Sequence, residues 1–230
     1  MIGYLHHDCR FELFVWLKGK FLYTIAGNFA RLQLIEPGRN DQFSRSIMKV
    51  AVIAVFTALS LSTNYLMIDA PNIKLMDSLI FIAGFLFGLD VGVATAVSVW
   101  LVYGFVNPYG QDGIVLLLFL IAGECFYAVA GALLRRTTRP WRMFTSWGFW
   151  HSVIVFGGLG LVTTFAYDAL TNFATYLFLA NSLYQAFLIG MITGAPFAIL
   201  HELSNTFFFA TIVPSAIYSA QRSRLGLGGN

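Results

Sequence analysis

The sequence predicts an all-α integral membrane protein, a bundle of six transmembrane helices with both termini in the cytoplasm. Hydrophobic residues make up 58% of the 230 residues and charged residues only 11%, so water-exposed surface cannot be most of the chain. Several apolar blocks reach the roughly 20 residues that a helix needs to cross a bilayer. Basic residues cluster between these blocks, and the positive-inside rule uses such clusters to orient the helices.

Three segments follow from the distribution of charge. Residues 1–46 form an amino-terminal extension, residues 47–219 the membrane domain and residues 220–230 a short cytoplasmic tail. The extension carries too many charges for a spanning helix. Either it lies on the membrane surface as an amphipathic helix, or it is incidental and the native start is Met48, the next methionine.

The first predicted span covers residues 47–68, and Arg45 and Lys49 at its start place that end in the cytoplasm. The next apolar run, residues 78–106, is long for a bilayer core of roughly 30 Å at about 1.5 Å per residue. Its topology depends on whether it is one helix or two.

One helix over this run would place the basic cluster RRTTRPWR, residues 135–142, outside the cell. A break near residues 88–92, with Asp90 at the turn, places the same cluster inside. The positive-inside rule therefore predicts two short helices separated by this break.

The remaining spans are predicted at residues 114–134, 147–167 and 183–213, with the segment TNFATYLFLAN (171–181) as an outer connector. The carboxyl-terminal apolar region could hold one long helix or two ordinary ones. One helix keeps Arg222 and Arg224 inside, so we expect one.

The stretch GAPFAILHELSN, residues 194–205, resembles part of a zinc-protease helix. That motif needs H-E-x-x-H, because two imidazoles on one face bind the ion, but its fifth position here is Asn205. The sequence predicts neither a metal site nor a catalytic residue here. A stripe of small and polar residues is predicted to face the bundle interior instead: Gly190, Gly194, Ala198, His201 and Asn205.

Glu124 lies near the centre of the fourth predicted span, at a depth comparable to that of His201. The two side chains could therefore meet across the interior, because intramembrane polar groups are costly unless they are paired. Two roles are open for them, a structural hydrogen-bonded pair and a part of a substrate site.

Small residues also follow helical spacing in the first three helices. One stripe consists of Ala51, Ala54 and Ala58, and another of Gly84, Gly88, Gly92 and Ala96. Such stripes let helices approach closely. Periodicity does not separate packing inside the protein from docking of another membrane protein.

Polar residues gather at the outer ends of the predicted spans. They are Asn64, Asp69, Asn72, Lys74, Asp77, Asn107, Tyr109, Gln111, Asp112, Tyr167, Asp168 and Asn172. Oriented polar groups with aromatic walls could form a pocket for a small polar compound. Solvated loops with an interfacial tyrosine belt are the other interpretation.

Several functions lack their sequence signature. The chain has no G-x-x-x-x-G-K-[ST] phosphate loop, no G-x-S-x-G turn and no cysteine or histidine cluster. Its net charge of +3 is small and does not suggest a nucleic-acid partner. Cys9 and Cys125 lie in different environments, so we expect no disulfide between them.

The sequence resembles the substrate-binding S components of energy-coupling factor (ECF) transporters over about residues 46–219. The resemblance is carried by the order of five segments: AVIAVFTALS, IKLMDSLIFIAGFLFGLDVG, TTFAYDALTN, GAPFAILHELSN and FFFATIVP. It implies a multi-pass protein of the plasma membrane, not an enzyme, that captures a vitamin or related micronutrient from outside.

The resemblance also implies partners and site residues. The partners would be a membrane T component and two cytoplasmic ATPases, so ATP is used by the partners and the chain itself needs no cofactor. Ala51, Ala54 and Ala58 would contact the T component. By this resemblance the ligand would bind to the outer loops and helix ends, at residues 72–77, 107–112 and 167–172. The residue pattern itself adds Asn64, Glu124 and His201 as further candidates.

Two rival functions remain open. A stand-alone secondary transporter could relay protons through Glu124, His201 and Glu202. An enzyme of the membrane interior is the third hypothesis. It requires turnover or a stoichiometric metal in the purified protein.

Overall fold

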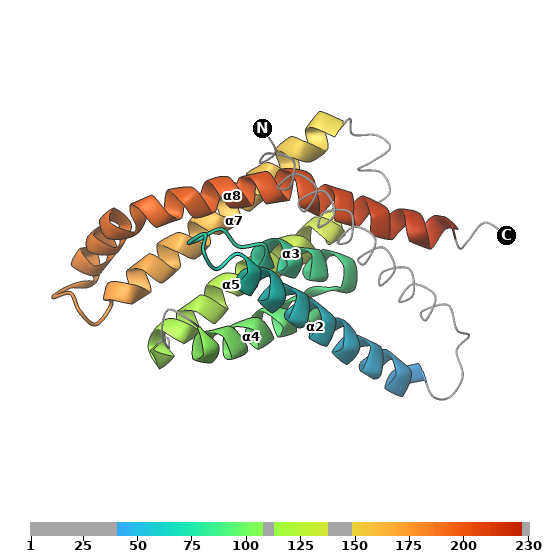
Figure 1. The fold of residues 1–230 in the computed structure, drawn as a ribbon, viewed down its shortest axis with the longest axis horizontal. Helices are drawn as coiled ribbons and strands as arrows, with labels where there is room; N and C mark the ends of the chain where they lie inside the picture. Colours follow the sequence, from blue (N-terminus) through green and yellow to red (C-terminus); the bar gives the residue numbers. More distant parts are fainter. Residues whose placement is uncertain (1–40, 108–112, 138–148, 227–230) are drawn as a thin grey trace, which may run out of the picture.

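The computed structural model describes residues 41–107, 113–137 and 149–226, and these ranges contain helices and no strand (Figure 1). The helices are α2 (Asp41–Leu66), α3 (Met76–Phe87), α4 (Leu89–Val106), α5 (Ile114–Thr137), α7 (Phe149–Tyr176) and α8 (Leu183–Gly226). The all-helical fold class is therefore confirmed. Most of the predicted amino-terminal extension, residues 1–40, lies outside the described ranges.

Five of these helices are long and apolar enough to cross a membrane: α2, α4, α5, α7 and α8. The sixth, α3, has 12 residues and spans only about 18 Å at about 1.5 Å per residue. Lengths and composition of this kind are those of a multi-pass membrane protein.

The short helix α3 occupies the centre of the bundle. It packs against α2, α4, α5 and α8, while α7 and α8 pair along their length and meet the rest of the bundle through α5 and α3 (Figure 1). The residues from Met76 to Phe85 are all buried. Phe81 lies at the middle of an aromatic cluster, 5.0 Å from Phe209 and 6.1 Å from Phe156 between ring centroids. α3 is thus surrounded by protein over most of its length.

The predicted break in the second apolar run is confirmed at Gly88, between α3 and α4. Gly88 has a φ of 108°, a conformation that residues with a Cβ rarely adopt. Beside it, Asp90 forms an ion pair with Lys49 of α2, and Arg135 of α5 donates a hydrogen bond of 3.1 Å to the Leu86 carbonyl. These contacts place the start of α2, the α3–α4 turn and the end of α5 together.

The glycine stripe next to this break is used inside the protein. A Cβ on Gly92 would lie 2.8 Å from the Gly84 Cα and 2.9 Å from the Ala128 Cβ. Both distances are too short for a real Cβ contact. The glycines therefore allow α3, α4 and α5 to pack closely, as the first of the two interpretations proposed.

The carboxyl-terminal region is one helix, as expected, and α8 continues through Pro196 and Pro214 into the predicted tail. The predicted boundary of the preceding span was wrong, because α7 runs on to Tyr176. Thr171 donates to the Tyr167 carbonyl at 3.0 Å and Thr175 to the Thr171 carbonyl at 2.9 Å. The helix backbone thus satisfies the hydroxyl groups of two residues that the sequence assigned to the outer connector.

Candidate functional site

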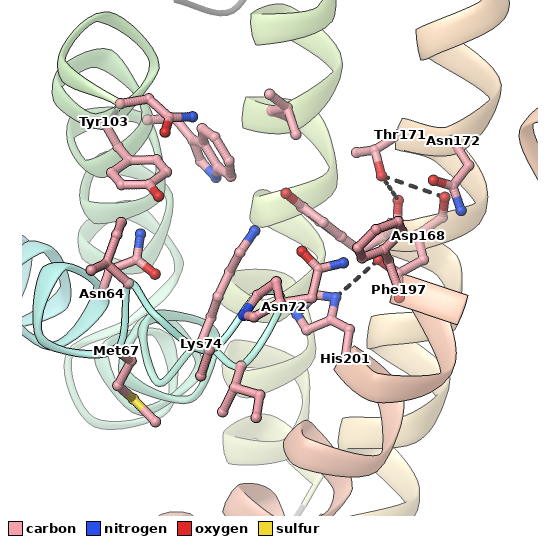
Figure 2. A pocket seen from close by; sticks show the side chains of 18 of the residues that line it. Asn64, Met67, Asn72, Lys74, Tyr103, Asp168, Thr171, Asn172, Phe197 and His201 are labelled. Atoms are coloured by element: carbon pink, nitrogen blue, oxygen red, sulfur yellow. Dashed lines mark hydrogen bonds and ion pairs between the residues drawn. The ribbon is translucent and has the colours of Figure 1, made fainter. Parts of the chain in front are cut away.

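A cavity of about 420 Å³ lies at the end of the bundle opposite the α3–α4 turn. Its wall comprises the end of α2, the α2–α3 loop, the end of α4, the start of α5, the second half of α7 and the first half of α8 (Figure 2). The lining residues are Asn64, Met67, Ile68, Ala70, Pro71, Asn72, Ile73, Lys74, Trp100, Tyr103, Asn107, Leu116, Leu120, Tyr167, Asp168, Thr171, Asn172, Thr175, Phe197 and His201.

The α2–α3 loop supplies one wall of this cavity. Its backbone is closed by local hydrogen bonds, from the Ala70 amide to the Met67 carbonyl at 2.9 Å and from the Ile73 amide to the Ala70 carbonyl at 3.2 Å. Asn72 has a φ of 58°, a left-handed conformation that asparagine adopts more readily than most residues. This turn directs the Lys74 side chain into the cavity (Figure 2).

Aromatic side chains form much of the remaining wall. Trp100 and Tyr103 lie on α4 with their ring centroids 5.7 Å apart, and Tyr167 comes from α7. The Lys74 Nζ lies 5.4 Å from the Trp100 ring centroid and 6.0 Å from that of Tyr167. These distances are within the range of cation–π attraction.

The floor of the cavity is a buried network centred on His201, which is 1% exposed. Its Nε2 lies 2.7 Å from the Asp77 Oδ2, and its Nδ1 lies 2.9 Å from the Asp168 Oδ1. Both ring nitrogens can donate only when the imidazole is protonated. The geometry therefore describes an imidazolium held between two carboxylates, one from α3 and one from α7.

Neutral polar groups complete the network. Asn205, one turn after His201, donates 2.6 Å to the Asp77 Oδ2 and 2.9 Å to the Thr164 Oγ1. The Tyr127 hydroxyl also donates to the Thr164 Oγ1, at 3.0 Å. The interior stripe of α8 thus carries a hydrogen-bonded cluster that joins α3, α5, α7 and α8.

Glu124 and His201 do not pair, so the expectation that they meet is wrong. Both nitrogens of His201 are already occupied by aspartates. The Glu124 Oε2 instead accepts a 2.9 Å hydrogen bond from the Trp100 Nε1, and Asp77 is a neighbouring charged residue. Glu124 therefore supports the aromatic wall from behind and does not line the cavity.

The cavity brings together most of the residues predicted from the sequence to bind substrate. Those that line it are Asn64, Asn72, Lys74, Asn107, Tyr167, Asp168, Asn172 and His201. Asp77 and Glu124 are buried beneath or behind the wall. Tyr109 and Gln111 lie outside the described residues. Ala54 and Ala58 are exposed on α2, and Ala51 is half-buried there.

Other lining residues were not predicted from the sequence, above all Trp100, Tyr103, Thr171, Thr175 and Phe197. Helical spacing contained part of this signal. Trp100 and Tyr103 lie seven and four residues before Asn107, and Thr171 and Thr175 lie three and seven residues after Asp168. Each set shares one helix face. Phe197 carries no such signal, because aromatic residues are frequent throughout the chain.

Comparison of the chain with protein-family models, curated proteins and solved structures gives no match. Within the described ranges, no group of three histidine, cysteine, aspartate or glutamate side chains is arranged to hold a metal ion. Function must therefore be inferred from the chemistry of the cavity itself.

Gly194 packs against Asn172, one of the residues that line the cavity, and this contact allows the contribution of Asn172 to be tested. A Cβ on Gly194 would overlap the side-chain amide of Asn172. We expect Gly194→Ala to displace that amide from the cavity and to weaken binding of a small polar ligand there by about tenfold, the effect of roughly one hydrogen bond. The melting temperature should change little, because the side chain can move.

The matched control for this substitution is Gly158→Ala, since a Cβ on Gly158 would have no atom within 4 Å. Both proteins would be compared by equilibrium dialysis and thermal unfolding in detergent. Unchanged binding in Gly194→Ala would show that Asn172 does not contribute to the site.

Proposed function

We propose that this protein is the substrate-binding S subunit of an ECF-type importer in the plasma membrane, where it captures a vitamin or related micronutrient on the outer side. The observation that carries the proposal is the cavity at one end of the helix bundle. It combines asparagine amides, one lysine and one aspartate with an aromatic wall. Sites for small polar molecules have this mixture of few polar anchors and many apolar contacts.

Charge distribution supports an outward-facing cavity and a bundle of six crossings with cytoplasmic termini. Lys49, Arg135 and Arg136 lie at the opposite end of the bundle, around the α3–α4 turn. The positive-inside rule assigns that end to the cytoplasm. In this topology α3, together with the loop that precedes it, counts as the second crossing.

The exposed alanines of α2 support a membrane partner. α2 packs mainly against α3 and α4, while Ala54 and Ala58 face away from the core. Small residues on an outward face allow another helix to approach closely. We assign this face to the T component, which would bring the two cytoplasmic ATPases that hydrolyse ATP.

The alanine face can be tested with bulky side chains. Changing Ala54 and Ala58 together to Phe should reduce recovery of the T component at least about tenfold, because the helices could no longer approach closely. Ligand binding should stay unchanged, since neither residue lines the cavity. The measurement is quantitative mass spectrometry of the tagged protein purified from native membranes.

Val162→Phe is the control, because Val162 is 65% exposed and lies on α7, whereas α2 packs mainly against α3 and α4. It should leave partner recovery unchanged. Equal loss of the T component in both variants would indicate a nonspecific effect and would contradict the assignment of the alanine face.

The central test of the proposed function is purification of the tagged, unaltered protein from its native membranes. We expect a T component and two ATPases to co-purify. Recovery of this protein alone, from membranes that contain those ATPases, would contradict the proposal.

One observation favours a secondary transporter as the second candidate. His201 lies between Asp77 and Asp168, with Glu124 close to Asp77, and such buried ionisable groups occur in proton relays. The two functions differ in their energy source. Uptake into vesicles that contain only this protein, driven by a pH gradient, would establish the transporter, whereas a requirement for ATP and partners would exclude it.

A further inference from the structure

The Lys74 ammonium group is the charged group of the cavity without a direct counterion. It projects into the open space (Figure 2), and within the described ranges it forms no hydrogen bond or ion pair. Its neighbours are the faces of Trp100 and Tyr167. Such a cation in a partly desolvated site favours a ligand that supplies a negative charge.

The carboxylates near the cavity are already engaged. Asp77 accepts hydrogen bonds from His201 and Asn205, and one oxygen of Asp168 accepts from His201. A cationic ligand would therefore find few free acceptors. It would also compete with Lys74 for the aromatic faces, because each ring attracts a cation through the same quadrupole.

Two polar atoms without a hydrogen-bond partner indicate where else a ligand could bind. The buried Asn64 Nδ2 and the buried Asp168 Oδ2 have no hydrogen-bond partner in the described part of the chain. Asn64 is 4% exposed and Asp168 is 6% exposed, and both line the cavity. A buried donor or acceptor without a partner is costly, so a ligand that pairs with both would be strongly selected.

The charges of the side chains around the cavity also indicate where a donor and an acceptor of the ligand would bind. One imidazolium and two aspartates leave the His201 cluster with one negative charge. The oxygen of this cluster that has no partner, the buried Asp168 Oδ2, belongs to a residue that lines the cavity. A ligand N–H group can donate there. A hydrogen-bond acceptor or anion of the ligand belongs on the other side, near Lys74 and Asn64.

We propose that the cavity selects a small compound that bears a carboxylate and an N–H donor. Lys74 and Asn64 bind the carboxylate, and Asp168 accepts the N–H group. This inference rests on the proposed capture function and specifies the class of its substrate.

Three small probes of similar shape test the carboxylate contact and the N–H contact separately. 4-Aminobenzoate carries both groups, 4-aminobenzamide lacks the negative charge, and 4-methylbenzoate lacks the N–H donor. Binding would be measured in detergent by isothermal titration at millimolar probe concentrations. We expect 4-aminobenzoate to bind at least about tenfold more tightly than either analogue, because each anchor is a charge-assisted hydrogen bond.

Substitution of Lys74 tests whether this side chain causes the preference for the carboxylate. Lys74→Met should weaken 4-aminobenzoate binding to the level of 4-aminobenzamide and leave 4-aminobenzamide binding unchanged. Lys74→Arg, the conservative control, should retain most of the preference for the carboxylate. Lys74 is half-buried on a loop, so both variants should fold, and thermal unfolding would verify this.

The inference is overturned if 4-aminobenzamide binds as tightly as 4-aminobenzoate, if Lys74→Met leaves the preference intact, or if none of the probes binds. These results are independent of partner recovery. Co-purified ATPases without a carboxylate preference would leave the S-subunit function standing with another ligand class. Carboxylate binding without partners would contradict the importer and leave the site assignment standing.

Discussion

Replacing His201 with alanine should lower the free energy of unfolding by about 3–5 kcal/mol, the usual effect of removing one partner from a buried ion pair. The Asp77 and Asp168 carboxylates would lose their shared cation while remaining inside the bundle. The measurement is unfolding in mixed micelles by titration with sodium dodecyl sulfate, followed by circular dichroism.

His151→Ala provides a matched control, because His151 is exposed near the start of α7. It should change the free energy of unfolding by no more than about 0.5 kcal/mol. Adding Asp77→Asn and Asp168→Asn to His201→Ala should restore part of the stability, since the uncompensated charges are then removed. If His201→Ala were as mild as His151→Ala, the buried ion pairs would not exist as described.

Replacing Gly131 with alanine should destabilise the protein by about 3 kcal/mol through overpacking. A Cβ on Gly131 would overlap the Phe81 carbonyl oxygen and lie 3.0 Å from the Phe85 amide nitrogen. Both atoms belong to the backbone of α3 and cannot rotate away. α3 and α5 would have to separate, which would also loosen the packing around the buried central helix.

Gly158→Ala is the control for this second prediction. It introduces the same methyl group on an exposed face, where no atom lies within 4 Å. Stability should stay the same or rise by up to about 1 kcal/mol, because alanine has the higher helix propensity. Thermal unfolding in detergent compares the two variants, and equal melting temperatures would show that α3 and α5 do not approach as closely as described.

Charge and periodicity predicted the main features of the helix bundle. The basic cluster at residues 135–142 required a break in the second apolar run, and the chain breaks at Gly88. The arginines after the last apolar residue required one carboxyl-terminal helix, and α8 is one helix. Such features depend on local composition and on the bilayer, which act on each segment separately.

Helix ends were harder to predict where polar side chains form hydrogen bonds to the backbone of their own helix. Thr171 and Thr175 looked like part of a loop, but their hydroxyls bond to carbonyls of the preceding turn. The sequence pattern cannot show whether a hydroxyl is solvated or bonded to its own helix.

The sequence alone determined that His201 and Asn205 face the interior, because spacing along a helix defines a shared face. Only the tertiary structure decided that His201 lies between Asp77 and Asp168 rather than beside Glu124. Asp77 and His201 are separated by 124 positions. Periodicity specifies which side of a helix is buried, but the partner across the interface depends on how the helices are rotated and shifted when their side chains pack.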